Sequence, residues 1–226
     1  IVFDAGSFDA GTEVDPKVPT VTLNGEARQT ISGNLEFTSS SGGSFYNLEV
    51  NNTSGVELLR NVEVENDLLL TSGDFITSSS SILTINNTAT DAVIGGGSSS
   101  FVDGPMQKNI NSSSSFDFPV GDASRYGNIF VSPDASSGGM WKARYYDENP
   151  AQVGLDPDLM DAGDDISFVS RNEYWNVEGP ASSNAEINVR WDEQSGFSSS
   201  STEIQKLRMV EWTTAEQWNE IDGTIN

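Results

Sequence analysis

The chain has 226 residues, and its 34 acidic against 11 basic side chains give a formal net charge of −23 at pH 7. A surface this acidic repels phosphate backbones and anionic lipid head groups, so we expect no nucleic-acid partner. The sequence contains neither Cys nor His, which excludes disulfides, thiolate or imidazole metal ligands, and any mechanism that needs an imidazole base. It contains no apolar run of about 18 residues, so we expect no membrane insertion.

Residues 1–20 have the composition of a connecting segment. The tetrapeptide FDAG occurs at 3–6 and again at 8–11, and prolines follow at positions 16 and 19. Because proline cannot donate a main-chain hydrogen bond inside a sheet, we expect a linker or the close of a preceding unit. The chain opens without Met or a secretory signal, so we interpret it as an internal piece of a longer protein.

From residue 21 onward the sequence has the pattern of short strands. Apolar residues two positions apart recur between Asn, Ser, Gly and Asp, and no stripe with the 3.6-residue period of a helix is present. The clearest pairs are Leu48/Val50, Val56/Leu58, Val62/Val64, Leu68/Leu70 and Leu83/Ile85. This pattern predicts one short strand after another, with polar corners between them.

Two comparisons within this stretch indicate a solenoid. VEVEN at 62–66 precedes the similar LTINN at 83–87 by 83 − 62 = 21 residues, and Leu48 precedes Leu68 by 68 − 48 = 20 residues. LEVNN, which starts at Leu48, also looks like LTINN. A step of roughly 20 residues suits one turn of a parallel β-helix, in which each turn buries its apolar edge against the next. We therefore predict a short right-handed parallel β-helix over residues 21–100.

A Gly-Ser run at 95–100 is the clearest change in composition. Such a run predicts either a junction between modules or a wide turn. No GK[ST] motif follows it, so it is not a phosphate-binding loop.

New apolar alternations follow the Gly-Ser run. The strands that we expect there include 116–118, 127–133, 140–147, 166–170, 173–179, 185–192 and 204–212. In one of them Ile187 and Val189 lie on one face, while Asn188 and Arg190 lie on the other. One apolar face and one polar face predict an antiparallel β-sandwich, which we place over residues 101–226. The whole chain is therefore expected to be nearly all β, and only TAEQWNEI at 214–221 favours a helical turn.

A series of short motifs runs through most of the chain. They are FYNL at 45–48, GVEL at 55–58, LLL at 68–70, LTI at 83–85, FVDGP at 101–105, FPVG at 118–121, EYW at 173–175, VRWD at 189–192, LRMVEW at 207–212 and Trp218. In this order the motifs resemble those of large secreted surface proteins of Bacteroidetes, in which a β-sandwich often follows β-helix repeats.

The resemblance implies a role outside the cell. Such proteins are commonly exported by the type IX secretion system through a C-terminal sorting domain, and many look like adhesins, including those of gliding bacteria. That sorting domain is absent from this sequence, as it would be from a fragment. The resemblance carries over no catalytic residues.

The most acidic loop of the sequence is GLDPDLMDAGDDI at 154–166. Its aspartates are Asp156, Asp158, Asp161, Asp164 and Asp165. Hard oxygen ligands at this density suit Ca²⁺, which accepts six to eight oxygens in flexible geometry. The loop lacks the glycine and the closing glutamate of an EF-hand. Two interpretations stay open, a calcium site and a solvated acidic loop.

The five tryptophans give a second candidate site. An exposed indole can stack on a sugar ring, but aromatic rings also dominate the interiors of β-sandwiches. Trp141 and Trp218 fit the alternating pattern least clearly, so of the five these two are the candidates for exposed rings that contact a glycan. Packing in the core is the interpretation that the sequence favours for the tryptophans as a group, because most of them lie in alternating strands beside apolar neighbours.

Together these patterns favour a non-catalytic structural or adhesive segment of a large secreted or cell-surface protein, stabilised by calcium if the acidic loop binds the ion. Its expected partners are other segments of the same protein and surface glycans, and no cofactor other than calcium is expected. The first alternative is a carbohydrate-binding module of a secreted polysaccharide-degrading enzyme, which requires exposed Trp rings. A polysaccharide lyase or hydrolase is the second, and it requires a groove where a basic residue meets acids.

Overall fold

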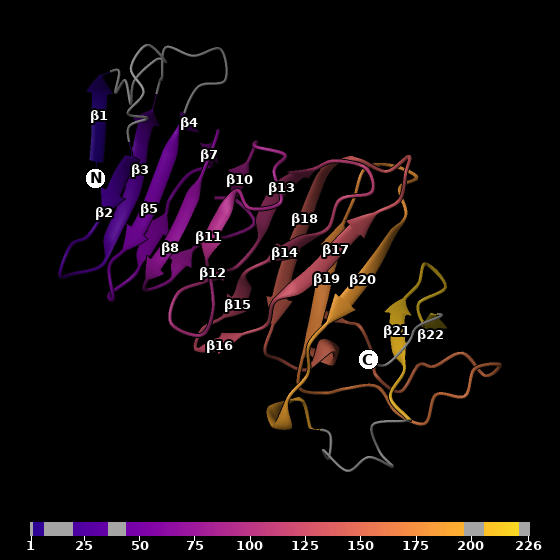
Figure 1. The fold of residues 1–226 in the computed structure, drawn as a ribbon. Helices are drawn as coiled ribbons and strands as arrows, with labels where there is room; N and C mark the ends of the chain where they lie inside the picture. The colour runs from indigo at the N-terminus through magenta and orange to yellow at the C-terminus, as the bar shows by residue number, and fades with distance from the viewer. Residues whose placement is uncertain (1, 7–19, 36–43, 197–205, 222–226) are drawn as a thin grey trace. The chain divides into compact units, whose positions relative to one another are not determined.

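The structure is a computed structural model that describes residues 2–6, 20–35, 44–196 and 206–221 (Figure 1). About 47% of the chain is strand and 3% is helix, which confirms the predicted all-β class. The chain divides into two compact units. Unit 1 comprises Ile1–Tyr145 and Trp175–Val189, and unit 2 comprises Tyr146–Tyr174 and Arg190–Asn226.

Unit 1 begins with a β-solenoid of about three turns, as the sequence predicts. Each turn contributes one strand to each of three parallel sheets, which we call faces 1, 2 and 3. Face 1 contains β2 (Thr20–Leu23), β5 (Asn47–Asn51), β8 (Leu68–Ser72) and β11 (Val93–Gly95). Face 2 contains β1 (Val2–Gly6), β3 (Gln29–Leu35), β6 (Val56–Leu58), β9 (Phe75–Ile76), β12 (Val102–Asp103) and β15 (Val120–Asp122). Face 3 contains β4 (Ser44–Phe45), β7 (Val62–Val64), β10 (Leu83–Ile85) and β13 (Met106–Ile110).

The register of the sheets matches both predicted steps. Val62 pairs with Leu83 on face 3, which is the step of 21 residues, and Leu48 pairs with Leu68 on face 1, which is the step of 20. The likeness of LEVNN to LTINN has another origin, because the first lies on face 1 and the second on face 3. Both are strands that run into an asparagine corner, so they share a local pattern without being stacked.

Alternation places the apolar side chains inside the solenoid. The three-residue strands β6, β7 and β10 each bury their first and last side chains and turn the middle one outward. The fully buried interior residues include Phe45, Leu48, Val50, Val56, Val62, Val64, Phe75, Leu83 and Ile85. Neighbouring turns cover one another's apolar edges, so the stack is stabilised as a whole and not turn by turn.

The Gly-Ser run is a wide turn inside the stack. It connects β11 to β12, and the Oγ of Ser100 donates a hydrogen bond of 2.7 Å to the carbonyl oxygen of Gly73 in the preceding turn. Gly95 has φ +87, and a Cβ there would lie 2.3 Å from the carbonyl oxygen of Leu70. Only glycine fits so close to the turn below, and parallel pairing continues past the run through β12 and β15.

The parallel stack gives way to antiparallel strands. Those strands are β14 (Phe116–Phe118), β16 (Arg125–Tyr126), β17 (Ile129–Pro133), β18 (Gly139–Tyr146), β19 (Tyr174–Glu178) and β20 (Ala185–Val189). On face 3, β18 pairs antiparallel with β13, and on face 2, β16 pairs antiparallel with β15. β14, β17 and β20 form a separate antiparallel sheet, whose inward side chains share one core with those of β18. This later antiparallel sheet is consistent with the predicted sandwich.

The described part of unit 2 contains two short 3₁₀ helices, η1 (Pro150–Val153) and η2 (Glu193–Ser195), and the hairpin of β21 (Met209–Trp212) and β22 (Trp218–Ile221). The helical turn predicted at 214–221 is wrong, because Trp218–Ile221 pairs with Met209–Trp212. The strand predicted at 166–170 is also absent from the structure. Whether each of these segments forms a strand depends on pairing with another strand, which a local sequence pattern does not reveal.

The start of the chain contributes a strand. Val2–Gly6 pairs in parallel with β3, while residues 7–19, with the second FDAG and both prolines, lie outside the described residues. Within the described ranges, no helix has the length and apolar character needed to cross a membrane.

Candidate functional sites

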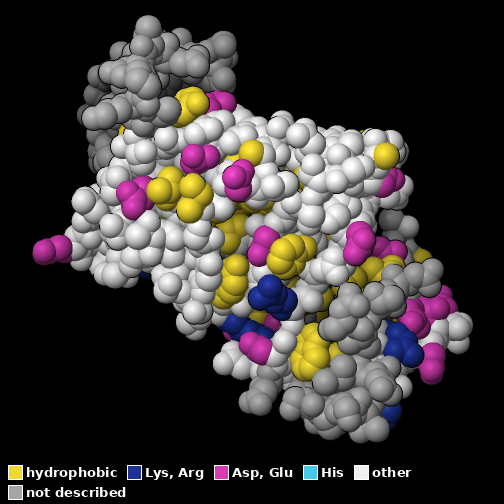
Figure 2. All heavy atoms as spheres, in the orientation of Figure 1, with side chains coloured by type: hydrophobic (Ala, Val, Ile, Leu, Met, Phe, Trp, Pro, Cys, Tyr) yellow, Lys and Arg dark blue, Asp and Glu magenta, His cyan; other side chains and the backbone are white. Residues whose placement is uncertain are grey.

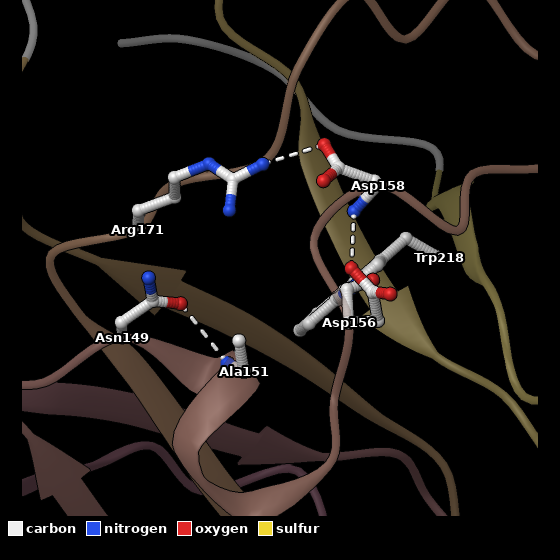
Figure 3. Close-up of polar contacts among 6 residues, drawn as sticks. All are labelled: Asn149, Ala151, Asp156, Asp158, Arg171 and Trp218. Carbon is white, nitrogen blue, oxygen red and sulfur yellow. Dashed lines mark hydrogen bonds and ion pairs between the residues drawn. The ribbon is translucent and has the colours of Figure 1, made fainter.

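The acidic loop predicted as a calcium site lies in unit 2, where its first two aspartates organise the main chain (Figure 3). The Oδ1 of Asp156 accepts a hydrogen bond of 3.0 Å from the backbone nitrogen of Asp158. The Oδ1 of Asp158 lies 2.5 Å from Nη2 of Arg171, so its charge is already paired with a guanidinium. Both carboxylates are exposed, and their first role is to shape the turn that begins at Pro157.

This loop is attached to the hairpin through Trp218. The backbone nitrogen of Trp218 donates a hydrogen bond of 2.8 Å to the carbonyl oxygen of Leu159, and its carbonyl oxygen accepts one of 2.9 Å from the nitrogen of Asp161. The indole Nε1 of Trp218 donates to the carbonyl oxygen of Asp156 at 3.1 Å. Through these hydrogen bonds the loop forms a short parallel bridge with β22. The bridge supports the hairpin, because a two-stranded hairpin is marginally stable alone.

The next two carboxylates hold the same hairpin. Asp161 accepts a hydrogen bond of 2.6 Å from the nitrogen of Gly163 on one oxygen and one from Nε2 of Gln217 on the other. The Oδ2 of Asp164 accepts a hydrogen bond of 2.7 Å from the nitrogen of Glu220. Asp165 is exposed.

In the structure the predicted calcium ligands therefore bind separate hydrogen-bond donors. Four of the five carboxylates bind N–H groups or a guanidinium. Among the residues that the structure describes, no group of three or more acidic side chains is arranged to hold a metal ion. Calcium binding by this loop stays a prediction of the sequence, while the hydrogen bonds to the hairpin are a feature of the fold.

The two tryptophans predicted to be exposed are buried. Trp141 is 4% exposed and Trp218 is 6% exposed, so the expectation of exposed rings is wrong. Trp141 lies on the inner face of β18 with Ala143 and Tyr145, and its Nε1 donates to the carbonyl oxygen of Ser137 at 3.0 Å. Trp218 lies beneath the acidic loop and packs edge-on against Trp212, with 5.4 Å between ring centroids. Neither ring offers a face to a sugar.

A shallow hollow of about 180 Å³ lies in unit 2. It is lined by the segment Phe168–Asn172 with Ser195 and Gly196. The ring of Phe168 is 65% exposed. The polar groups around it are already engaged: the guanidinium of Arg171 pairs with Asp158, and the amide of Asn172 donates to the carbonyl oxygen of Gln194 at 3.1 Å. The arrangement offers no free general acid or base.

A buried lysine is the most unusual ionisable group in unit 1. Lys108 on β13 is 0% exposed. Its Nζ donates hydrogen bonds to the carbonyl oxygens of Asn87 and Asn109, the latter at 2.7 Å, and lies 5.0 Å from the ring centroid of Phe116. Among the described residues it forms no ion pair, and burial lowers the pKa of its ammonium from 10.5 to about 8.

The sequence contains a signal for this lysine that our sequence analysis did not use. In MQKNI at 106–110, Lys108 lies between two apolar residues at alternate positions, so strand alternation points it inward. A charged residue at an inward position indicates either a functional group or an end of the regular stack. Here β13 is the last parallel strand of face 3, because β18 pairs antiparallel with it.

A second group of ionisable side chains lies on face 2. Burial raises the pKa of Asp74, and the nearby charge of Asp103 raises it further. Burial likewise raises the pKa of Asp103. The hydrogen bond from the nitrogen of Ala123 lowers this pKa, and the nearby charge of Asp122 raises it. Elsewhere the acids are dispersed, and Figure 2 shows them scattered over the visible face among fewer basic side chains. On this face the acidic side chains do not form one concentrated patch.

Comparison with known proteins adds no relationship: no protein family, no curated protein and no solved structure matches this sequence.

Proposed function

We propose that this chain is a non-catalytic structural and adhesive segment of a large secreted or cell-surface protein, of the kind that its motifs resemble in Bacteroidetes. The continuity of the solenoid supports this most directly. The parallel pairing of faces 2 and 3 continues from turn to turn into the antiparallel strands β16 and β18, while face 1 ends at β11. A stack closed at that end by antiparallel strands suits a segment that maintains a fixed shape between other parts of a protein.

The use of polar side chains supports the same proposal. At the corners, asparagine and threonine side chains bind the neighbouring turn: Asn66 donates to Asn47 at 2.9 Å, and the Oγ1 of Thr77 donates to the carbonyl oxygen of Pro105 at 2.8 Å. The carboxylates of the acidic loop bind the hairpin in a similar way. Groups that could otherwise perform acid–base chemistry hold the chain in place.

A cell-surface location follows from the proposal and can be tested directly. Antibodies against this chain should label intact producing cells, and a protease added outside the cells should remove the label. Labelling that requires permeabilised cells would contradict the proposal. Genetic removal of a type IX secretion component should retain the protein inside the cell if export follows the route that the resemblance implies.

The structural role makes a sharper prediction about internal deletions. Removal of residues 48–67 takes out one complete turn, because Leu48 and Leu68 occupy equivalent positions. Cells with this deletion should display the protein and attach to glycan-coated or cell surfaces nearly as the wild type does. The matched control removes residues 48–57, which is half a turn and should prevent folding.

Removal of the whole segment 1–226 provides the opposing test. The proposal predicts reduced attachment and unchanged turnover of polysaccharides. Unchanged attachment together with lost polysaccharide turnover would instead assign the chain to a degrading enzyme.

A further inference from the structure

The turn between β2 and β3 contains a chemically labile pair. Asn24–Gly25 is the only Asn-Gly sequence in the chain, and the side chain of Asn24 is exposed. Asparagine is thermolabile in proteins, and a following glycine has no Cβ to hinder attack by its own main-chain nitrogen. The pair is therefore the position in this chain at which spontaneous deamidation meets the least steric resistance.

The fold restrains the nitrogen that would attack. The backbone nitrogen of Gly25 donates a hydrogen bond of 2.9 Å to Oε1 of Gln29. The same oxygen accepts a hydrogen bond of 3.1 Å from Nδ2 of Asn52, which also donates to the carbonyl oxygen of Ala27 at 2.8 Å. Asn52 is 1% exposed, so Gln29 is held by a buried amide of the next turn of the solenoid.

A second contact between the same two turns supports this arrangement. The Oγ of Ser54 donates a hydrogen bond of 2.9 Å to the carbonyl oxygen of Glu26. The turn at residues 24–28 is thus fastened to the turn at 52–54 at several points. The Gly25 nitrogen is freed when its hydrogen bond to Gln29 opens, and the contacts of this turn with residues 52–54 oppose that opening.

The reaction itself requires only water. The Gly25 nitrogen loses its proton to a solvent base and attacks Cγ of Asn24; a C–N bond forms, and Nδ2 leaves as ammonia. Water then opens either C–N bond of the resulting five-membered imide, and the product is aspartate or isoaspartate. A nitrogen whose proton is held in a hydrogen bond is protected from this first step, as it is from hydrogen exchange.

We propose that Asn24 is a deamidation site that the Gln29–Asn52 contact keeps closed, so that its modification marks molecules whose first turn has opened. The isoaspartate product lengthens the backbone of the turn by one methylene. It also adds a negative charge to a chain that already carries −23. Both changes oppose the return of the turn to its original position, so the modification makes a transient opening permanent.

Two substitutions at Gln29 test the proposal. Gln29→Met removes the acceptor and keeps the length of the side chain, whereas Gln29→Glu keeps an oxygen acceptor for both Gly25 and Asn52. The folded proteins are incubated at mildly alkaline pH, and deamidation at Asn24 is followed by peptide mass spectrometry. We expect Gln29→Met to deamidate at least about fivefold faster than the wild type, the change that about 1 kcal/mol gives, and Gln29→Glu to deamidate no faster.

Hydrogen exchange at Gly25 separates protection from general instability. In Gln29→Met, exchange of this amide should accelerate together with deamidation while that of Val50 stays slow. If Gln29→Met fails to fold, Ser54→Ala removes only the contact to Glu26 and should give a smaller acceleration of both rates. Equal deamidation rates in the folded wild type and in the urea-unfolded chain would overturn the proposal.

Discussion

The Oδ1 of Asn47 accepts a hydrogen bond of 2.9 Å from Nδ2 of Asn66, and the two asparagines occupy the same corner in successive turns of the solenoid. The same oxygen accepts a hydrogen bond of 3.0 Å from the nitrogen of Asp67. Nδ2 of Asn87 continues the column by donating to the carbonyl oxygen of Asn66 at 3.2 Å. The amides of Asn47 and Asn87 therefore bind main-chain groups of a neighbouring turn, and the amide of Asn66 connects the two.

Asn47→Ala should destabilise the protein because it removes an acceptor that two donors use. Asn47 is 8% exposed, so the nitrogens of Asn66 and Asp67 would lose their partner in a largely dry environment. We expect the free energy of unfolding to fall by about 1–3 kcal/mol in urea titrations. Asn51→Ala, at an exposed position of the same strand, is the matched control and should change it by less than about 0.5 kcal/mol. Equal effects of the two substitutions would argue against the column.

Lys108 should make stability depend on pH. The pKa of its ammonium is about 8 in the folded protein and 10.5 ordinarily, so between these values the unfolded chain binds more protons. The free energy of unfolding of the wild type should therefore rise with pH across this window, relative to Lys108→Met, by at most about 3 kcal/mol. The measurement is urea unfolding of both proteins at several pH values from 7 to about 10.5.

The control for this experiment is Lys142→Met, which also removes one positive charge from face 3. Lys142 lies near the surface, 2.7 Å from a carboxylate oxygen of Glu178. A pH slope that is the same in the wild type and in Lys108→Met would show that the buried ammonium does not titrate in this range.

The solenoid could be predicted from sequence because its signal is local and repeated. Alternation identifies the inward residues, and equal spacing identifies equivalent positions, so the pairing of Leu48 with Leu68 is readable without coordinates. Most of the hydrogen bonds at the corners could not be predicted from the sequence in this way. The link between Asn47 and Asn66 depends on how two turns align, and Asn residues at corners are common for other reasons.

The candidate sites were harder to predict because they depend on distant contacts. Trp218 is buried by the acidic loop, and its indole bond to Asp156 spans 62 residues of sequence. The same loop satisfies its aspartates with hairpin amides that no local pattern reveals. Trp141 was predictable in principle, since Trp141, Ala143 and Tyr145 alternate on one face of β18. Composition drew attention to the acidic loop, but not to what its side chains bind.

Asp103→Asn should stabilise the protein at neutral pH. The pKa of Asp103 is raised above 3.8 mainly by burial, so the folded protein holds this proton at pH values where the unfolded chain has released it. The wild type therefore loses stability as the pH rises through this range, and the amide variant avoids the loss. We expect a gain of less than about 1 kcal/mol at pH 7, because solvent screens a half-buried charge.

This effect must be separated from the general benefit of removing a negative charge. Asp91→Asn, at an exposed position, measures that benefit alone. Thermal unfolding of the three proteins at pH 4, 5.5 and 7 should show a gap between the Asp103 variant and the wild type that widens with pH. A gap of the same size in the Asp91 variant would assign the effect to net charge.

Asp161→Ala should loosen the acidic loop from the hairpin in the absence of any metal. Asp161 accepts hydrogen bonds from Gly163 and from the side chain of Gln217, so its removal frees both donors next to Trp218. Hydrogen exchange in EDTA should show faster exchange of the Trp218 amide in this variant, whereas Asp165→Ala, at an exposed position of the same loop, should leave it unchanged. Repeating the measurement with added calcium distinguishes the two roles of the loop. If calcium slows the exchange in the wild type and the Asp165 substitution abolishes that slowing, the ion organises the loop; if both proteins exchange as they do in EDTA, the hydrogen bonds alone hold it.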